Sequence, residues 1–384
     1  MKVIHLITSI NRGGAENHVY DLAVYQKKNG YEVEIVYFKG DGYWGRNFNK
    51  NGIKVLCFNP YFKIVKFLNY LFFFYRLVIY IKLSKADILH SHLPLMDVFT
   101  RLLFYFLNKS FVFISTKHLD NYSLRGSDRY KNTKSYLSIL IENWIISKCD
   151  KFIAISKTVK NFYLKNFALS RNYIKVVYYG ISKIHDSKIN KKRIIFFPKN
   201  KKKIIFGTVS RLVRQKRIDV TLRALSILKK ENVKFLYYII GEGPLLFYLK
   251  NLTKSLEIDE NVKFIGYSDN INRFFKHIDV FCLSSDHEGL GLVLLESMIS
   301  GVPIVCSKFG AACEIIPNDN FGLLFNKSDY EDMASKLKTI LSNNLRKKIS
   351  KNSKKYVTNY FSMKKCFNKT HSIYISELKK LYKC

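Results

Sequence analysis

The sequence is short of acidic residues: 29 Asp and Glu stand against 65 Lys and Arg in 384 residues, which gives a formal net charge of +36. It also lacks features that define several protein classes. Its seven cysteines form no C-x-x-C pair and no Cys/His spacing typical of zinc sites, so we expect reduced thiols in a cytosolic compartment and no structural metal. The apolar run at residues 1–7 is too short for a signal peptide. What remains is a globular chain long enough for two domains.

Nothing except its charge suggests a nucleic-acid-binding protein. The excess of basic residues is spread over both halves of the chain, whereas a nucleic-acid site concentrates it on one face. The sequence has no helix-turn-helix, zinc finger or aromatic RNA-binding motif. We therefore expect no nucleic acid as partner, and attraction to an anionic membrane surface as the best functional use of the charge.

Short apolar segments alternate with helical stretches through both halves, which is typical of parallel sheets covered by helices. The expected strands are 3–8, 32–38, 54–58, 88–90, 111–115, 152–155 and 175–178 in the first half, and 204–209, 235–240, 262–265, 280–283, 304–306 and 322–325 in the second. The sequence predicts an α/β protein with two doubly wound domains, 1–183 and 204–365, and a final helix at 366–384. The polar, lysine-rich segment 184–203 is the expected linker.

Residues 61–83 are the most apolar and aromatic segment, but polar residues such as Lys63, Lys66 and Arg76 interrupt it. No uninterrupted run approaches the roughly 20 residues that a membrane-spanning helix needs. On a helix, most of these polar residues share one side and leave a broad Phe/Leu/Ile face opposite. Two interpretations stay open: a helix packed within the first domain, or one that also lies, with residues 102–107, in the headgroup layer of an anionic membrane.

Glycine and histidine follow expected strands of the first domain. Gly13 and Gly14 come after the first strand and before a helix at 17–28, where backbone N–H groups can approach an anion or simply form a tight turn. His118 also follows a strand; it is either a group that hydrogen-bonds a substrate hydroxyl or an ordinary loop histidine. His90 and His92 resemble it, but we assign them mainly a structural role.

Two cations follow the first strand of the second domain. Arg211 and, five residues on, Lys216 precede a helix at 219–230. At the carboxyl end of a buried strand they are well placed to neutralise a diphosphate, although either one alone could be surface charge.

Glu288 and Glu296 bracket an apolar segment with glycines at 289 and 291, which predicts a turn that opens a helix. A helix N-terminus is a natural phosphate site, and a carboxylate on either side of it can hold sugar or ribose hydroxyls. Internal salt bridges beside a core helix would explain the same residues.

Taken in order, these motifs resemble the retaining glycosyltransferases of family 4, which have the two-Rossmann-domain fold called GT-B. The resemblance runs from the Gly13-Gly14 loop to the Gly301-Val302-Pro303 turn and Glu314, nearly the whole chain. Two positions depart from the family pattern: Tyr179-Gly180 stands where members often have Asn-Gly, and Gly310-Ala311 where they have Gly-Gly.

The resemblance implies two domains that face each other across a cleft, with the final helix returning to the first domain. It implies that the first domain binds the acceptor and the second binds the donor. The site residues it implies are Glu288 for the donor sugar, Glu296 for the ribose, Arg211 and Lys216 for the diphosphate with the backbone around Leu292 and Val293, His118 for the donor sugar, and Gly14 near the phosphate and acceptor.

The expected activity is transfer of a hexosyl group from a UDP- or GDP-sugar to an acceptor hydroxyl with retention, without a metal, because the cations take the role of a divalent ion. The expected acceptor is a lipid-linked or polysaccharide intermediate of bacterial capsule or lipopolysaccharide assembly. We expect a cytoplasmic protein, with peripheral docking on the inner face of the membrane as an extension. The alternatives are a sugar-nucleotide epimerase of the same fold and a non-catalytic nucleotide- or glycan-binding module.

Overall fold

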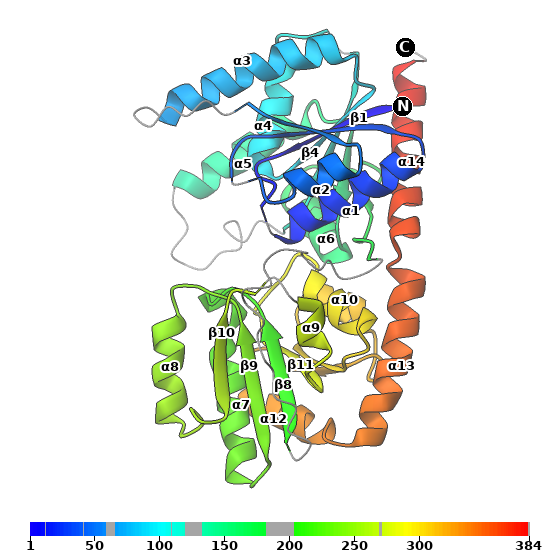
Figure 1. The fold of residues 1–384 in the computed structure, drawn as a ribbon. Coiled ribbons are helices and arrows are strands. Elements are labelled where there is room, and N and C mark those ends of the chain that lie inside the picture. The colour runs from blue at the N-terminus through cyan, green and yellow to red at the C-terminus, as the bar shows by residue number, and fades with distance from the viewer. Residues whose placement is uncertain are drawn as a thin grey trace. The chain divides into compact units, whose positions relative to one another are not determined.

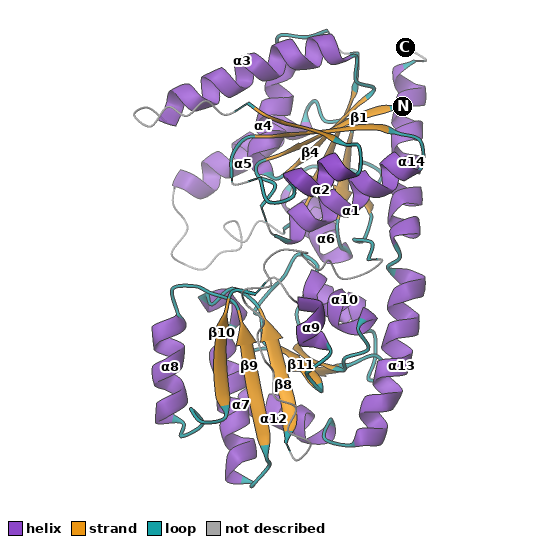
Figure 2. Cartoon of the chain, viewed as in Figure 1, coloured by secondary structure: helices purple, strands orange, loops and turns teal. Residues whose placement is uncertain are grey.

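The predicted alternation of strands and helices is present in the computed structural model (Figures 1 and 2). The structure describes residues 1–11, 13–40, 42–58, 66–108, 110–119, 133–181, 203–268 and 271–382. The predicted linker 184–203 lies outside these residues except for its last position, as do residues 61–65 of the apolar segment. The chain divides into two compact units, which we call unit 1 (Met1–Gly180 with Met363–Cys384) and unit 2 (Ile181–Ser362).

Unit 1 contains a seven-stranded parallel sheet in the order β3-β2-β1-β4-β5-β6-β7. Its strands are β1 (Lys2–Ile7), β2 (Glu32–Tyr37), β3 (Lys54–Cys57), β4 (Ile88–His92), β5 (Val112–Lys117), β6 (Lys151–Ala154) and β7 (Ile174–Val176). Its helices are α1 (Gly14–Lys28), α2 (Gly45–Lys50), α3 (Lys66–Ser84), α4 (Pro94–Leu103), α5 (Thr133–Ile146), α6 (Lys157–Asn166) and α14 (Met363–Leu381). The strand order reverses between β1 and β4, and such switch points are where ligands bind in open α/β sheets.

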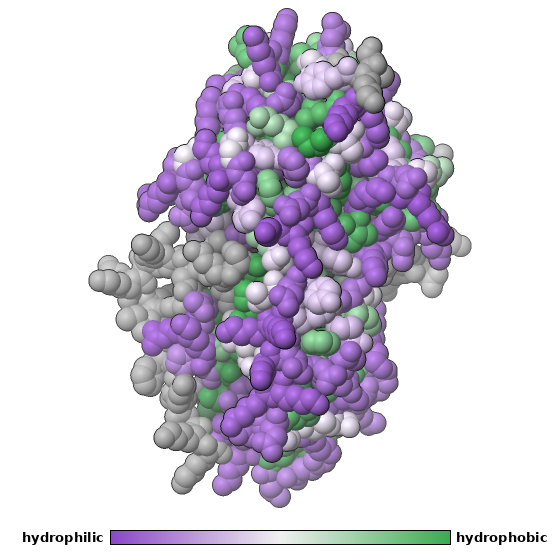
Figure 3. All heavy atoms as spheres, turned by 90° about the vertical axis from the view of Figure 1, so that its right-hand side faces the viewer, coloured by the Kyte–Doolittle hydropathy of each residue, from purple (hydrophilic) through white to green (hydrophobic). Residues whose placement is uncertain are grey.

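The last helix of the sequence belongs to unit 1. Residues of α14 such as Cys366, Phe367 and Tyr374 share one buried cluster with Val3 and Ile88 of the central strands. The expected return of the final helix to the first domain is confirmed, and the helix begins at Met363, three residues before Cys366. On the face drawn in Figure 3, most of the visible coloured side chains are hydrophilic.

Unit 2 contains a six-stranded parallel sheet in the order β10-β9-β8-β11-β12-β13. Its strands are β8 (Ile204–Val209), β9 (Phe235–Ile240), β10 (Val262–Gly266), β11 (Val280–Leu283), β12 (Ile304–Ser307) and β13 (Leu323–Phe325). Its helices are α7 (Ile218–Lys230), α8 (Leu246–Ser255), α9 (Ile271–Phe275), α10 (Leu292–Ile299), α11 (Gly310–Ile315), α12 (Tyr330–Thr339) and α13 (Asn343–Tyr360), with a 3-10 turn at Arg214–Lys216. The switch point lies between β8 and β11, and both units therefore share the doubly wound order.

Helix α3 buries only a narrow stripe of the apolar segment. Phe73, Leu77 and Ile81 are buried, at the helical spacing of four residues. Large apolar side chains on the rest of α3 are exposed: Phe67, Leu68, Tyr70, Leu71, Phe72, Tyr75, Ile79 and Leu83. The 18-residue segment Phe67–Ser84 is long and apolar enough to cross a membrane, and only 17% of it is buried. In length and mean hydropathy this segment is thus closer to a membrane-spanning helix than its interrupted sequence suggested. A core helix of a soluble protein can have the same length and hydropathy.

Candidate functional site

At the switch point of unit 2, the loop after β8 carries the predicted cations. Gly241 and Gly243, which follow β9, pack directly against this loop. A Cβ on Gly241 would lie 1.8 Å from the carbonyl oxygen of Ser210, and one on Gly243 would lie 2.5 Å from that of Leu212. The Leu212 N–H donates to the Glu242 carbonyl oxygen at 2.9 Å. The two glycines therefore allow the backbones to meet and fix the path of the chain on either side of Arg211.

Arg211 and Lys216 have different environments. Arg211 is exposed, whereas the side chain of Lys216 is only 13% exposed. The Lys216 ammonium forms an ion pair with Glu288 Oε1, which also accepts a hydrogen bond from Ser285 Oγ at 2.8 Å. The Glu288 side chain is 14% exposed. The structure thus joins Lys216 to Glu288 and leaves the Arg211 guanidinium open to solvent.

Hydrogen bonds tie the loop after β8 to the loop after β11. Ser284 Oγ donates to the Arg217 carbonyl oxygen at 2.6 Å, and the Asp286 N–H donates to the Gln215 carbonyl oxygen at 2.8 Å. Gln215 Nε2 donates to the carbonyl oxygen of His287 at 2.8 Å. These contacts hold the carboxylate of Glu288 and the ammonium of Lys216 together although 72 residues separate them in sequence.

Helix α10 starts next to Glu288, as the glycines predicted. Gly291 has φ +86°, a left-handed conformation that favours glycine, and Leu292 is the first helical residue. Leu292 and Val293, the first two residues of the helix, are half-buried. Glu296 lies in the second turn of α10 and is also half-buried.

The switch point of unit 1 contains a cluster of histidines. His5 of β1 is in register with His90 of β4, and Ile7 with His92. Side chains two residues apart on a strand share a face, so His5, His90 and His92 lie together under α1 and α14. The ring nitrogens of His5 and His92 lie 3.0 Å apart, His5 Nε2 meets Gln26 Oε1 at 2.7 Å, and His90 Nδ1 meets the Tyr374 hydroxyl at 2.5 Å.

Burial keeps these imidazoles neutral. It lowers the pKa of His5 to about 4 and that of His118 to about 3, the latter with a contribution from Lys117. Burial and the neighbouring histidines lower the pKa values of His18, His90 and His92 well below the ordinary value. A neutral imidazole carries one N–H donor and one bare nitrogen acceptor, so each ring can pass a hydrogen bond from one side to the other.

His118, the predicted substrate-contacting histidine, is buried with both ring nitrogens occupied. Nε2 lies 3.1 Å from Nδ1 of His92, and Nδ1 is hydrogen-bonded to the Tyr179 hydroxyl. The ring is 6% exposed. To contact a sugar, His118 must therefore exchange one of these partners. Gly14, by contrast, is exposed, and a Cβ there would have nothing within 4 Å.

Three buried polar atoms around the Gly13-Gly14 loop have no hydrogen-bond partner among the described residues: Asn11 Oδ1, Asn17 Oδ1 and His18 Nδ1. The His18 ring stacks on Tyr179, with ring centroids 4.1 Å apart. Unpaired buried polar atoms are costly. Their position after β1 therefore supports a polar ligand or ordered water at this loop.

Comparisons with known proteins agree with this architecture. The model for Glycosyltransferase Family 4 matches residues 12–183, and the model for Glycosyl transferases group 1 matches residues 190–356. The chain belongs to glycosyltransferase family 4.

Individual relatives of this glycosyltransferase cover one or both units. One uncharacterized glycosyltransferase of Methanocaldococcus jannaschii is 31% identical over 58% of this chain and 59% of its own, and a second is 28% identical over 94% of each. A capsular polysaccharide biosynthesis glycosyltransferase of Staphylococcus aureus is 25% identical over 70% of this chain and 73% of its own. Anabaena HepE, solved with UDP and glucose, has a TM-score of 0.78 at 19% identity and covers 98% of this chain and 100% of its own.

Some residues that contact the predicted site residues of this glycosyltransferase, in either unit, were not found from the sequence. Ser285 contacts Glu288, and Tyr179 contacts His118. The serine belongs to no motif that the sequence analysis identified. The tyrosine was noted only as a departure from the family pattern.

The sequence spacing also did not show that three histidines converge. Ligand atoms of His5, His90 and His92 lie within 4.8 Å of one another, which is close enough for one metal ion. Nitrogens of all three rings already form hydrogen bonds with protein partners. A metal would have to break some of those bonds, so the geometry fits a hydrogen-bonded cluster of neutral rings better than an ion site.

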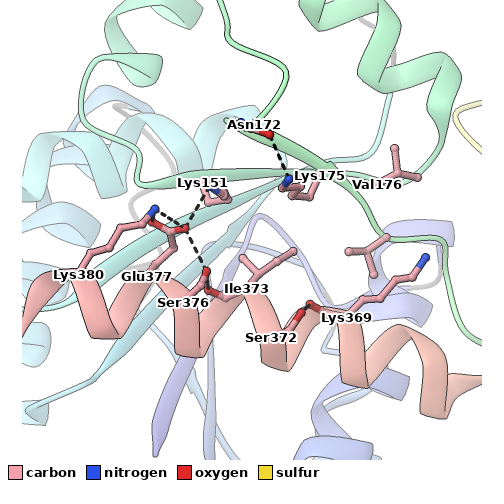
Figure 4. Close-up of a pocket in the computed structure, with 11 residues that line it drawn as sticks. Lys151, Asn172, Lys175, Val176, Lys369, Ser372, Ile373, Ser376, Glu377 and Lys380 are labelled. Carbon is pink, nitrogen blue, oxygen red and sulfur yellow. Dashed lines mark hydrogen bonds and ion pairs between the residues drawn. The ribbon is translucent and has the colours of Figure 1, made fainter.

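A lysine-lined recess of about 540 Å³ lies elsewhere in unit 1, between β6, β7 and α14 (Figure 4). Glu377 pairs there with Lys151 at 3.1 Å and with Lys380 at 2.7 Å. Lys175 and Lys369 also line it. Lys151 opens β6 and so lies at the amino end of the sheet, whereas His118 follows the carboxyl end of β5, where ligands of this fold bind.

Proposed function

We propose that this glycosyltransferase moves a hexosyl group from a UDP- or GDP-sugar to an acceptor hydroxyl with retention of the anomeric configuration. The observation that carries the proposal is the Lys216–Glu288 pair beside the exposed Arg211, at the switch point of unit 2 and next to the start of α10. A diphosphate needs cations and N–H donors, and a sugar needs a carboxylate acceptor; this arrangement supplies both.

In the proposed reaction the bond between the anomeric carbon and the diphosphate oxygen breaks, and a bond from that carbon to the acceptor oxygen forms. The acceptor proton passes to the departing diphosphate. Negative charge develops on the leaving group, and Arg211, Lys216 and the α10 N-terminus stabilise it. When sugar hydroxyls donate to Glu288, the Lys216 ammonium is freed to turn toward the phosphates. No metal is required in this scheme, because the two cations neutralise the diphosphate.

The comparisons support the donor class. HepE has the same fold and was solved with UDP and glucose, and the two family models match both units. By analogy we assign Glu296 to the ribose, Leu292 and Val293 to the phosphates, His118 to the donor sugar, and Gly14 to the neighbourhood of the phosphate and acceptor.

The capsule relative and the exposed face of α3 support the acceptor class, a lipid-linked or polysaccharide intermediate of surface glycan assembly. Phe67, Leu71 and Tyr75, spaced by four residues, are 66%, 50% and 63% exposed, and Phe106 beside α3 is 63% exposed. The rings of Phe74 and Phe106 lie 5.3 Å apart, so the two apolar segments form one surface. An aromatic face of this size on a basic protein is suited to the headgroup layer of an anionic membrane, at the cytoplasmic side.

Transfer is tested with a panel of UDP- and GDP-sugars, each labelled in the sugar, together with a lipid-linked acceptor fraction. We expect one donor to give labelled acceptor with a retained anomeric centre. A new sugar nucleotide formed from donor alone would instead identify an epimerase, and saturable donor binding without any turnover would identify a binding module. An inverted product would contradict the retaining mechanism.

Membrane docking is tested by flotation with vesicles that contain anionic phospholipid. We expect binding that weakens with salt and is lost in the triple variant Phe67→Ser, Leu71→Ser, Tyr75→Ser. The matched control is Phe247→Ser with Tyr248→Ser, which removes exposed aromatics from α8 of unit 2. Equal binding of the triple variant and the wild type would reject α3 as the docking surface.

A further inference from the structure

A continuous chain of hydrogen bonds runs through the buried histidines of unit 1, and its direction can be worked out. Gln26 Oε1 is only an acceptor, so the His5 Nε2 that faces it at 2.7 Å must carry the proton. Neutral His5 then has a bare Nδ1, which accepts from His92 Nε2 at 3.0 Å. By the same step His92 Nδ1 accepts from His118 Nε2 at 3.1 Å, and His118 Nδ1 is left as an acceptor for the Tyr179 hydroxyl.

From the amide nitrogen of Gln26, further hydrogen bonds run in the same donor-to-acceptor direction. Its Nε2 donates to the Tyr374 hydroxyl at 3.4 Å. That hydroxyl donates to His90 Nδ1 at 2.5 Å, and His90 Nε2 donates to Thr116 Oγ1 at 2.6 Å. We call this series, from Tyr179 through His118, His92, His5, Gln26, Tyr374 and His90 to Thr116, the histidine relay. Every histidine in the relay has its proton on Nε2.

Tyr179 forms the end of the relay next to His118, and its own position is tightly held. Its ring is 3% exposed and stacks on His18 at an interplanar angle of 18°. Gly180 presses the backbone against α14, since a Cβ there would lie 2.5 Å from Met363 Cα. Burial, with Glu16 and Cys366 nearby, raises the pKa of Tyr179 well above its ordinary value, so the hydroxyl stays protonated and donates. An asparagine, which family members often have at this position, has no such ring to stack.

We propose that Tyr179 is a positioning residue for sugar transfer, because its hydroxyl and the histidine relay together hold His118 in the Nε2–H tautomer. The tautomer of His118 does not depend on the proposed function; only the effect of that tautomer on sugar transfer rests on it. In that tautomer Nδ1 is an acceptor, so a sugar hydroxyl can replace the Tyr179 hydroxyl there, whereas a phosphate or carbonyl oxygen cannot. The relay therefore makes His118 selective for a hydroxyl donor.

The tautomers are tested on the wild-type protein by nitrogen NMR after selective labelling of histidine with ¹⁵N. We expect His5, His90, His92 and His118 each to show a protonated Nε2 and a bare Nδ1 at neutral pH. Tyr179→Phe keeps the stacked ring and removes the hydroxyl, and it should change the Nδ1 signal of His118 most. Protonated Nδ1 in His118 and His92 of the wild type would overturn the proposal. This measurement does not depend on any transfer activity.

Kinetics tests the catalytic consequence. Tyr179→Phe should lower kcat/KM about tenfold, mainly through a higher donor KM, because one lost hydrogen bond lets most of the free His118 adopt the Nδ1–H tautomer, which cannot accept from a sugar hydroxyl. The matched control is Tyr173→Phe, which removes a hydroxyl that donates to the Ile146 carbonyl oxygen at 2.8 Å outside the relay. Equal kcat/KM values for both variants and the wild type, with the His118 signals unchanged in Tyr179→Phe, would show that Tyr179 is only a packing residue.

Discussion

The two units share one strand order but have opposite chemistry at their switch points. Between β8 and β11, unit 2 holds a lysine, a glutamate and an exposed arginine. Between β1 and β4, unit 1 holds uncharged rings that hydrogen-bond to one another beneath two helices. The same backbone topology thus places charged side chains at one switch point and uncharged, hydrogen-bonded rings at the other. The topology locates a site, and side chains at the strand ends decide its chemistry.

The largest effect is expected at the charged switch point. Glu288→Gln keeps the shape of the side chain and removes the charge that pairs with Lys216. We expect transfer to fall by a factor of roughly 10² or more, the scale of a lost electrostatic contact to the reacting group, while nucleotide binding persists. Labelled-sugar transfer and nucleotide calorimetry measure the two properties separately.

Glu260→Gln, which removes an exposed carboxylate of unit 2, is the control and should have near wild-type activity. Full transfer by Glu288→Gln would contradict the assignment of this residue to the donor sugar.

The neutral switch point should respond to acid. The folded pKa values of its histidines are depressed, so below the free value of 6.5 the unfolded chain binds more protons than the folded unit. The stability of unit 1 is therefore complete above pH 6.5. It falls as the pH drops toward about 4 for His5 and about 3 for His118. Each histidine contributes ~1.4 kcal/mol per pH unit within its window.

Hydrogen exchange at pH 7.5 and pH 5 should show protection falling further in β1 and β4 than in β8 and β11, where the described residues contain no such histidine cluster. Equal losses in both units would indicate that the acid response does not arise in the relay.

Arg211 offers a smaller change at the charged switch point. The Arg211 side chain is exposed, and Gly241 and Gly243 hold the backbone on either side of it. Arg211→Ala should therefore preserve the fold. It should weaken binding of UDP or GDP by roughly 10- to 100-fold, as expected for a charge-assisted hydrogen bond to phosphate. Arg214→Ala, another exposed arginine of the same loop, is the matched control for the loss of charge. Calorimetry with equal affinities for the two variants would rule out the clamp.

The smallest effect is expected at Gly14 in unit 1. Its missing Cβ has open space around it, so Gly14→Ala should alter the free energy of unfolding by less than about 1 kcal/mol. If a ligand approaches this backbone, kcat/KM should still fall several-fold. Thermal unfolding and kinetics on one preparation compare stability with kcat/KM. An unchanged kcat/KM would show that Gly14 does not contact the ligand.

The sequence predicted the framework better than the contacts. Every expected strand is present, because alternating apolar segments and glycine turns are local signals. The turn before α10 followed from Gly291 in the same way. The relay could not be predicted, since the contact of His5 with His92 depends on the register of two parallel strands 87 residues apart. The two-position spacing of His90 and His92 on one strand predicted a shared face, but it did not show which residue they would contact.

The separation of α14 from the rest of unit 1 in the sequence has a consequence for biosynthesis. A ribosome makes residues 181–362 before it makes Met363–Leu381, so the segments that form unit 2 are complete while unit 1 still lacks the helix that carries Tyr374. Domains usually fold in the order of their synthesis. Here the first unit to begin is finished after the second, and until α14 is made His90 lacks the Tyr374 hydroxyl that it contacts in the folded unit.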